Sequence, residues 1–429
     1  MSNQINYNDI PLIDHIKKLY PYCRSLTGDG ARETLKYFEK YHPEYNRLVF
    51  PSGTKVLDWE IPYEWNIQDA YIEHLDTGQR FARFSKDNLH IVGYSEPVDK
   101  IIDYKELLPR IHTLKEQPDW VPYVTSYYKK YWGFCMSESE KKQLPKGKYR
   151  VFIDSTLHKG NLEISHALLE GQLSQEILFT SYICHPSMAN NELSGPVVLN
   201  ALMSYIKKTY KSTKYTYRFI MEPETIGSIA YLSLFSNTLK NNVICGINLS
   251  CVGDNRGYSY VQTPYNNTLA DKALRSALYQ LDNVKEYSFL QRGSDERQYC
   301  SPGIRLPVCT FCRTKFGEYP EYHTNADNLN VVNEEGLQGA YSVLKNIIDS
   351  FEIGLYPKTK VIGEPQLGKR GLYPNISEKN AYQKVKIRMN LLAYSDGKTS
   401  IFDISSFIKC SLNELLIEYR NLKNNGLIE

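Results

Sequence analysis

The chain has 429 residues, which is long enough for two or three domains, and it carries 51 lysine and arginine residues against 48 aspartate and glutamate residues. The formal net charge of +3 is nearly balanced, so the composition does not indicate a polyanionic partner. No apolar run has the length of a membrane span, the start MSNQINYNDI lacks the features of a signal peptide, and nine scattered cysteines suit a reducing compartment, so we expect a cytoplasmic protein.

Two helices are predicted at the start of the chain. Residues 8–20 place apolar side chains at helical spacing. A second helix follows the turn SLTGDG, with Leu35, Tyr37 and Phe38 as its inner face. Both patterns are those of amphipathic helices that cover one side of a larger core.

The segment from about 51 to 159 has short strand-like runs separated by Gly, Pro and Asp turns, which predicts an inserted β-rich domain. Its aromatic cluster TSYYKKYWGFC, residues 125–135, is interpreted as core packing, and the alternative is a wall over an active site that recognises the substrate. The three histidines of this segment, His74, His90 and His112, lack the spacing of metal ligands.

From about residue 148, strand-like and helical patterns alternate along the chain. Strands are predicted at 149–155, 162–168, 176–184, 216–221, 243–252 and 306–312, and helices at 196–207, 228–236, 267–281 and 333–351. This alternation predicts an α/β fold with a mixed, mostly parallel sheet flanked by helices. His158 and His166 lie within or beside strands and are interpreted as structural.

A segment rich in Gly, Pro and Lys, residues 356–375, is predicted to be a linker, and residues 376–429 form a three-helix pattern typical of a winged helix-turn-helix. DNA binding requires basic and amide side chains on the exposed face of the last helix. That face is predicted to present Asn413, Glu414, Glu418, Asn421 and Lys423. We therefore expect a packing or oligomer-forming module, and we do not expect nucleic acid as a partner.

The stretch Glu176–Leu202 carries the first motif with chemical character. A buried strand delivers His185 to its carboxyl end, and the following loop brings Asn190, Asn191 and Glu192 beside it. In an open α/β sheet, ligands bind at this edge.

Two further segments add candidate ligands. Glu222 and Glu224 follow the next strand, where two carboxylates can act as a metal ligand and a general base or form the acidic first turn of a helix. The later segment 293–328 contains Asp295, Glu296 and Arg297, and then His323 beside Asp327. Imidazole nitrogens and carboxylates at successive strand ends are the donors that zinc prefers. The single CxxC, Cys309 and Cys312, has no second pair and is not expected to hold zinc.

These motifs, in their order and spacing, resemble the zinc exopeptidases of the co-catalytic aminopeptidase superfamily. The matching sequences are CHPS, the SG that follows the NNEL loop, PETIGS and YHT. More closely, the chain resembles a bacterial aminopeptidase-like family with an inserted small domain and a C-terminal winged helix, whose members often lie among genes for polysaccharide or natural-product biosynthesis. The resemblance implies a discontinuous peptidase domain made of residues 1–50 and 160–355.

The chain also departs from the superfamily pattern. Asn191 stands where a metal-bridging Asp is expected, and Ser250 replaces a further Asp ligand. Neutral side chains do not offset the charge of two dications, which disfavours a two-zinc site. Pro223 separates the two glutamates, so Glu222 takes the ligand position by one alignment and Glu224 by another, and we favour Glu224. Two interpretations of Asp254 remain open: it substitutes for the absent Asp ligand, or it caps a turn.

The resemblance implies metal-assisted hydrolysis of an amide next to a free amino group, with one zinc held by His185, His323, Glu224 and the Asn191 oxygen. The other glutamate, or Glu224 itself if it is not a ligand, takes the proton from the metal-bound water and passes it to the leaving amine. Asp295, Glu296, Arg297 and Tyr322 are candidates for binding the substrate, a small peptide or an aminoacylated small molecule. Two alternatives remain open, namely another acyl transformation such as amide exchange or cyclisation, and a catalytically impaired binding or regulatory protein. A homo-oligomer through the winged helix or the inserted domain is also considered.

Overall fold

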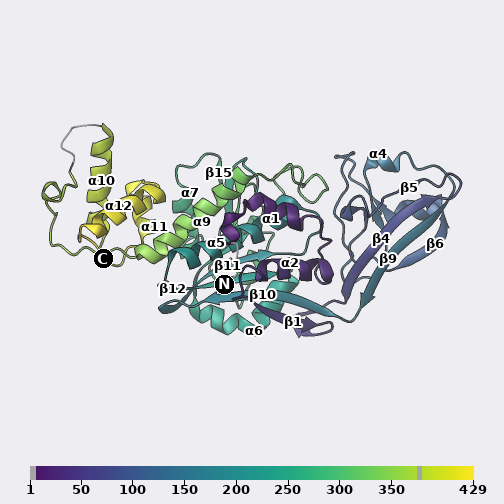
Figure 1. Ribbon diagram of the computed structural model, residues 1–429, viewed down its shortest axis with the longest axis horizontal. Coiled ribbons are helices and arrows are strands. Elements are labelled where there is room, and N and C mark those ends of the chain that lie inside the picture. Colours follow the sequence, from purple (N-terminus) through teal and green to yellow (C-terminus); the bar gives the residue numbers. More distant parts are fainter. Residues whose placement is uncertain (1–5, 374–378) are drawn as a thin grey trace.

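The computed structural model describes residues 6–373 and 379–429 and is built around one large mixed sheet (Figure 1). The eight strands have the order β1-β10-β12-β11-β13-β16-β14-β15. They span β1 Asn46–Pro51, β10 Asn161–Leu169, β11 Leu173–Tyr182, β12 Tyr215–Glu222, β13 Val243–Leu249, β14 Tyr258–Val261, β15 Val284–Tyr287 and β16 Val308–Cys312. The central strands β12, β11, β13 and β16 are parallel, whereas β1, β10 and the β14-β16 pair are antiparallel. The predicted fold class is confirmed.

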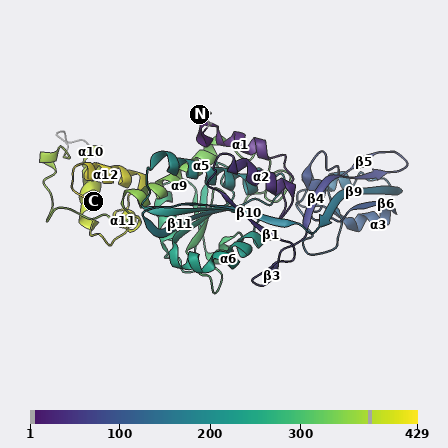
Figure 2. The ribbon, with the colours of Figure 1, turned by 60° about the horizontal axis from the view of Figure 1, so that its bottom comes forward.

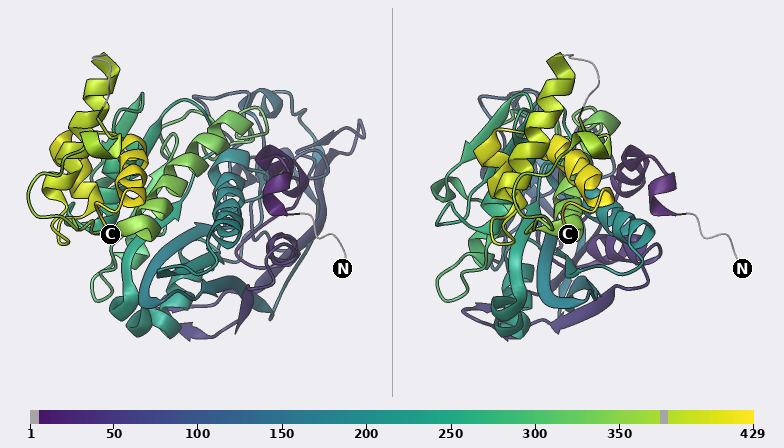
Figure 3. Two further views of the ribbon diagram at one scale, coloured as in Figure 1. Left: turned by 60° about the vertical axis from the view of Figure 1, so that its left-hand side comes forward. Right: turned by 90° about the vertical axis from the view of Figure 1, so that its left-hand side faces the viewer.

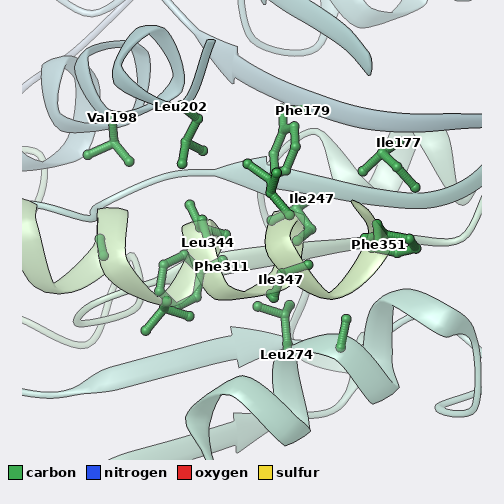
Figure 4. Close-up of a cluster of buried hydrophobic side chains, with 14 of the residues drawn as sticks. Ile177, Phe179, Val198, Leu202, Ile247, Leu274, Phe311, Leu344, Ile347 and Phe351 are labelled. Atoms are coloured by element: carbon green, nitrogen blue, oxygen red, sulfur yellow. The ribbon is translucent and has the colours of Figure 1, made fainter. Parts of the chain in front are cut away.

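Helices cover both faces of this sheet, as Figure 2 shows. The main helices are α1 Leu12–Leu19, α2 Asp29–Glu39, α5 Ser194–Thr209, α6 Ile226–Asn242, α7 Leu269–Leu278 and α9 Glu334–Gly354. Ile177 and Phe179 of β11 pack in one hydrophobic cluster with α5 and α9, while Leu178, between them, packs in a second cluster with α6. Figure 4 shows the first cluster, in which Phe179 lies among Leu202, Ile247 and Leu344. Burial on both faces explains why β11 reads as a continuous apolar run.

A second, four-stranded sheet of order β5-β4-β9-β6 lies beside the first (Figure 1). It is formed by β4 Glu64–His74, β5 Arg80–Phe81, β6 Val98–Asp103 and β9 Lys148–His158, with the short pairs β2 Lys55–Val56 with β3 Trp59–Glu60 and β7 Ile111–His112 with β8 Phe134–Cys135. The short helices α3 Tyr104–Leu107 and α4 Glu138–Lys141 also belong to this part of the chain.

The α/β pattern begins at β10 rather than at about residue 148, because the strand predicted at 149–155 is β9 and pairs with β4 and β6. Tyr149, Val151 and Ile153 alternate toward the interior of the second sheet. The chain then turns at Lys159-Gly160 and enters β10 of the large sheet.

The C-terminal helices α10 Lys379–Tyr394, α11 Ile401–Ile408 and α12 Leu412–Asn424 pack together at the end of α9 (Figure 3). On α12, the Tyr419 hydroxyl donates to the Ile353 carbonyl at 3.1 Å, and Arg420 pairs with Asp349 at 2.7 Å. Glu418, predicted to be exposed, is buried and pairs with Arg388 of α10, so that prediction is wrong. Among the described residues, no helix combines the length and apolar character needed to cross a bilayer.

Candidate active site

The carboxyl ends of β11 and β12 face a cavity of about 330 Å³. His185 follows β11, Glu224 follows β12, and His323 reaches the same cavity from the long loop after β16. The cavity is lined by Leu26, Trp59, Tyr123, Tyr127, Tyr128, Cys184, His185, Glu224, Thr225, Ile226, Arg297 and His323. The structure therefore brings together the His, Glu and His that the sequence placed at strand ends.

His185 is held in one orientation by a buried carboxylate. Its Nδ1 lies 2.7 Å from Glu192 Oε2, and Glu192 in turn lies 3.8 Å from the buried guanidinium of Arg24. The hydrogen bond at Nδ1 leaves Nε2 free, 3.6 Å from Glu224 Oε2. Burial alone would lower the pKa of His185, but the carboxylates of Glu192 and Glu224 outweigh it and the pKa is raised.

The two glutamates have separate environments. Glu224 lines the cavity, and burial raises its pKa to about 7. Glu222 is fully buried behind the cavity, where its Oε1 accepts hydrogen bonds from Tyr299 at 2.6 Å and Thr180 at 3.1 Å. Burial, with the nearby Asp295, raises the pKa of Glu222 far above its usual range.

The His323 side chain offers an unused nitrogen. Its Nε2 is buried and has no hydrogen-bond partner among the described residues. The ring stacks on Tyr322 with centroids 3.8 Å apart and lies 5.3 Å from the ring of His185. Burial and the nearby His185 lower the pKa of His323 to about 3, so the imidazole is neutral. A neutral imidazole with a free nitrogen is a metal ligand rather than an acid.

Several loops near the cavity contain residues with left-handed backbone. Ser187, Thr225, Cys251 and His323 all have φ between 44° and 66°. Thr225 has φ 66° and ψ −70°, and Ile226 N donates to the Glu224 carbonyl at 2.8 Å, which makes a γ-turn of the rare strained form. A β-branched residue in this conformation is costly and must be held by its surroundings.

Asp295 supplies that restraint. Its Oδ1 accepts hydrogen bonds from the Thr225 backbone N–H and the Ser228 hydroxyl, each at 2.8 Å. Asp295 does not line the cavity, and burial raises its pKa to about 6. Its place in the structure is behind the turn that presents Glu224.

The Asn191 and Ser250 side chains are joined through a tyrosine. Asn191 Oδ1 accepts a hydrogen bond from the Tyr182 hydroxyl at 3.0 Å, and Ser250 lies 2.6 Å from the same hydroxyl. Neither lines the cavity. Asp254 lies elsewhere and caps a turn, with its carboxylate accepting from Thr314 and Arg256 backbone N–H groups.

Of the three remaining predicted residues, Arg297 lines the cavity, whereas Glu296 and Tyr322 do not. Glu296 is buried and accepts from Gly293 N at 2.8 Å and Thr310 Oγ1 at 2.5 Å, away from the cavity. Arg297 lines the cavity, donates to Thr225 Oγ1, and has a buried Nε without a partner among the described residues. Tyr322 contacts the site by stacking on His323.

Sequence reasoning missed part of the lining. The segment 51–159 contributes four aromatic residues to the cavity lining, which we call the aromatic wall: Trp59, Tyr123, Tyr127 and Tyr128. Two of them belong to the 125–135 cluster, while Trp132 and Phe134 of the same cluster are buried in the core. The cluster thus contributes to both the core and the cavity lining, and the amino-acid types alone could not separate these residues. Recognition of a substrate by the lining residues stays a prediction.

Cysteine does not build a second metal centre at the CxxC. Cys309 and Cys312 are three residues apart on β16 and pack in hydrophobic clusters on opposite faces of the sheet. Among the described residues, Cys184, His185 and Glu192 are the group with ligand atoms within 4.8 Å of one another. Because His185 Nδ1 and Glu192 already share a 2.7 Å hydrogen bond, we interpret this group as support for His185 rather than as a metal site.

The donor types that line the cavity suit one zinc ion better than two, although the ligand atoms of His185, Glu224 and His323 do not all lie within 4.8 Å of one another. His185 Nε2, His323 Nε2 and Glu224 offer two imidazole nitrogens and a carboxylate, the composition of many catalytic zinc sites. The hydrogen bond from His185 Nδ1 to a carboxylate is the usual partner arrangement of a zinc-bound histidine. With Asn191 and Ser250 bonded to Tyr182, no second set of carboxylates lines the cavity in the described part of the chain.

Comparison with known proteins places this arrangement in a family. Residues 13–354 match the model of the domain of unknown function DUF4910, and residues 355–429 match a winged helix-turn-helix model. A Clostridium acetobutylicum protein, whose name gives it an aminopeptidase-like domain and provisionally a role in polysaccharide biosynthesis, is 41% identical over 399 residues, covering 91% of this chain and 89% of that protein.

Solved structures agree with this assignment. The crystal structure of a provisionally assigned peptidase from Clostridium acetobutylicum has a TM-score of 0.88 at 36% identity and covers 97% of this chain and 95% of its own. A zinc aminopeptidase from Bacillus subtilis has a TM-score of 0.57 at 13% identity, covering 80% of this chain and 94% of its own, and shows the shared fold. The predicted resemblance is confirmed, and the chain is a member of the aminopeptidase-like DUF4910 family with a C-terminal winged helix-turn-helix.

Proposed function

We propose that this protein is a one-zinc amide hydrolase that cleaves an amide next to a free amino group. The observation that carries the proposal is the convergence of His185 Nε2, the Glu224 carboxylate and the unpartnered His323 Nε2 on one cavity. The names of the aminopeptidase relatives support the same reaction class.

A bound zinc would polarise the scissile carbonyl and lower the pKa of a coordinated water. His185 and His323 would hold the ion, with Glu192 keeping the His185 ring in place. Among the described residues Glu224 is the one carboxylate that lines the cavity and so contacts the metal site. We assign to it the removal of a proton from the attacking water and the transfer of that proton to the leaving amine. The buried Nε of Arg297 is a donor for the substrate carbonyl.

The cavity favours a small substrate. Trp59, Tyr127 and Tyr128 form an apolar wall that suits the side chain of an aminoacyl group or the face of a sugar ring. The relative's name supports an aminoacylated sugar or a related biosynthetic intermediate, and a small peptide is the other candidate. We do not propose a nucleic-acid substrate or partner, because α12, the helix that would contact DNA, packs against α9.

A panel of aminoacyl amides and aminoacylated amino sugars tests the proposal, with release of the amine followed after zinc addition. Glu224→Gln should abolish turnover, and Glu222→Gln serves as the matched control because Glu222 lies outside the cavity. Activity that survives Glu224→Gln would contradict the assignment. Products in which the amine is exchanged or the chain cyclised would indicate another acyl transformation.

A second candidate, a catalytically impaired binding protein, is favoured by one observation. Asn191 and Ser250 replace expected carboxylates and are satisfied by Tyr182 within the protein. Such a protein would bind an amine-bearing ligand in the same cavity without turning it over. Ligand binding that persists without metal and without product would favour it.

A further inference from the structure

A second pocket, of about 400 Å³, lies at the other edge of the large sheet. It is formed by the start of β14, by β15 and by the loop that follows β16. Its charged lining consists of Arg256, Lys285, Arg313, Lys315 and Glu318. Four of these five side chains are cations. Arg256 is paired with Glu321 at 2.7 Å, so the excess positive charge of the pocket comes from Lys285, Arg313 and Lys315.

Arg313 is buried without a carboxylate partner. Only 5% of the residue is exposed, and its guanidinium donates to the carbonyls of Gly257 at 2.6 Å and Gly336 at 2.9 Å. Its guanidinium carbon lies 3.9 Å from the centroid of the Tyr258 ring. Each of these contacts is neutral, and the negative charges of Asp254 and Glu335 act on the guanidinium without a direct contact.

Lys315 has the same character. It is 8% exposed, and its Nζ donates to the Phe316 carbonyl at 3.1 Å and lies over the rings of Phe316 and Tyr287. One hydrogen bond leaves two of the three ammonium donors unused by the described residues. Glu318, three residues further on, lines the same pocket, and Asp254 behind the loop is bonded to Thr314 and to Asn190.

The rest of the chain treats buried arginines differently. Arg218 pairs with Glu176 at 2.6 Å, and Arg24 lies 3.8 Å from Glu192. A buried charge without a counter-charge is unfavourable, and it is retained where a ligand supplies the counter-charge. Arginine and lysine together are the usual partners of phosphate oxygens.

We infer that this pocket binds the phosphate group of a small organic phosphate. Arg313 and Lys315 would contact the phosphate oxygens from the buried side, and Lys285 would close the exposed side. A volume of about 400 Å³ exceeds what a phosphate ion alone requires, and Tyr258, Tyr287 and Pro320 supply apolar walls for the organic part. This pocket is separate from the zinc-ligand cavity. One chain of hydrogen bonds leads from it toward the loop after His185: Tyr319, which lines the pocket, donates to Asp327, and Asp327 accepts hydrogen bonds from the backbone N–H groups of Asn190 and Asn191.

Calorimetric titration of the full chain with inorganic phosphate, glucose 1-phosphate and UDP tests the inference. At least one organic phosphate should bind with a dissociation constant below about 1 mM and more tightly than inorganic phosphate. The three ligands distinguish a phosphate ion, a sugar phosphate and a nucleotide as the source of the group.

Lys315→Met, which keeps the length and removes the charge, should weaken binding at least about tenfold. If Lys315→Met does not fold, Lys285→Glu at the exposed rim provides the test, and it should also weaken binding. Lys159→Met, at an exposed turn after β9, is the matched control and should leave binding unchanged. His323→Ala should leave binding unchanged, because it alters the zinc-ligand cavity instead. Absence of binding by all three ligands, or affinity unchanged in the Lys315 and Lys285 variants, would overturn the inference.

Discussion

Glu192 Oε2 and His185 Nδ1 are joined by a 2.7 Å hydrogen bond between two buried side chains, and this contact decides which nitrogen of His185 faces the cavity. Asn191 has no carboxylate with which to bridge two metal ions, and its amide oxygen accepts a hydrogen bond from Tyr182. The carboxylate of Glu192 instead orients His185. This arrangement supports the proposed single-ion site.

Glu192→Gln should therefore weaken zinc binding. Loss of the carboxylate leaves the His185 ring less firmly oriented and less basic, and such changes beside zinc-bound histidines cost about 10- to 100-fold in affinity. Competition with a fluorescent chelator gives the affinity without reference to activity. Glu222→Gln, also buried but outside the cavity, is the control, and equal affinity in both variants would contradict the role of Glu192.

Asp295→Ala should destabilise the protein by about 1–3 kcal/mol, because it leaves the Thr225 N–H and the Ser228 hydroxyl without their acceptor. Chemical denaturation monitored by circular dichroism measures the loss. The strained turn should also relax, so kcat should fall more than KM rises. Asp282→Ala, at an exposed position, should change neither quantity, and an Asp295→Ala variant as stable as the parent would refute the restraint.

His42 predicts a pH dependence of stability away from the cavity. Burial lowers the pKa of His42 to about 4, against about 6.5 in an unfolded chain. The nearby Lys207 and, more weakly, His15 add to this effect, while Glu44 and the Asn200 backbone oppose it. Between these values the unfolded state binds the additional proton, so stability falls as the pH is lowered from 6.5 to 4, by about 3 kcal/mol from this group.

Unfolding free energies of the parent and of His42→Gln, measured from pH 7 to pH 4, isolate the contribution of His42. The variant should lose less stability on acidification than the parent. The exposed His158→Gln should follow the parent. Parallel curves for parent and His42→Gln would show that His42 is not buried in its neutral form.

The winged helix should not bind duplex DNA. On α12, Tyr419, Arg420 and Lys423 contact Ile353 and Asp349 of α9, so the helix that would enter a major groove is engaged within the chain. Fluorescence anisotropy with random duplexes should show no binding at low salt, where nonspecific binding is strongest. Submicromolar, salt-dependent binding would instead mean that α12 detaches from α9.

The sequence predicted the parts of the fold that depend on local periodicity. The strands before His185 and Glu222 are long apolar runs buried on both faces, and α5 and α9 have clear helical spacing. β14 and β15 were not predicted, because four-residue strands at a sheet edge leave little pattern.

The candidate site was predicted in outline and not in detail. Strand ends place His185 and Glu224, but the direction of a side chain cannot be read from its position in the chain. Glu222 turns toward Tyr299 and Glu224 toward the cavity because the strained turn at Thr225 separates them, and the tertiary contact with Asp295 holds that turn. The aromatic wall comes from the distant segment 51–159, whose packing no local rule specifies.

Metal content per chain tests the central claim most directly. Elemental mass spectrometry on protein purified without chelator should find about one zinc per chain, consistent with one His, Glu and His site, and the zinc should be lost in His323→Ala. Two ions per chain would contradict the single-ion site. No zinc, even after zinc is added back, would contradict the hydrolase proposal and favour a binding protein.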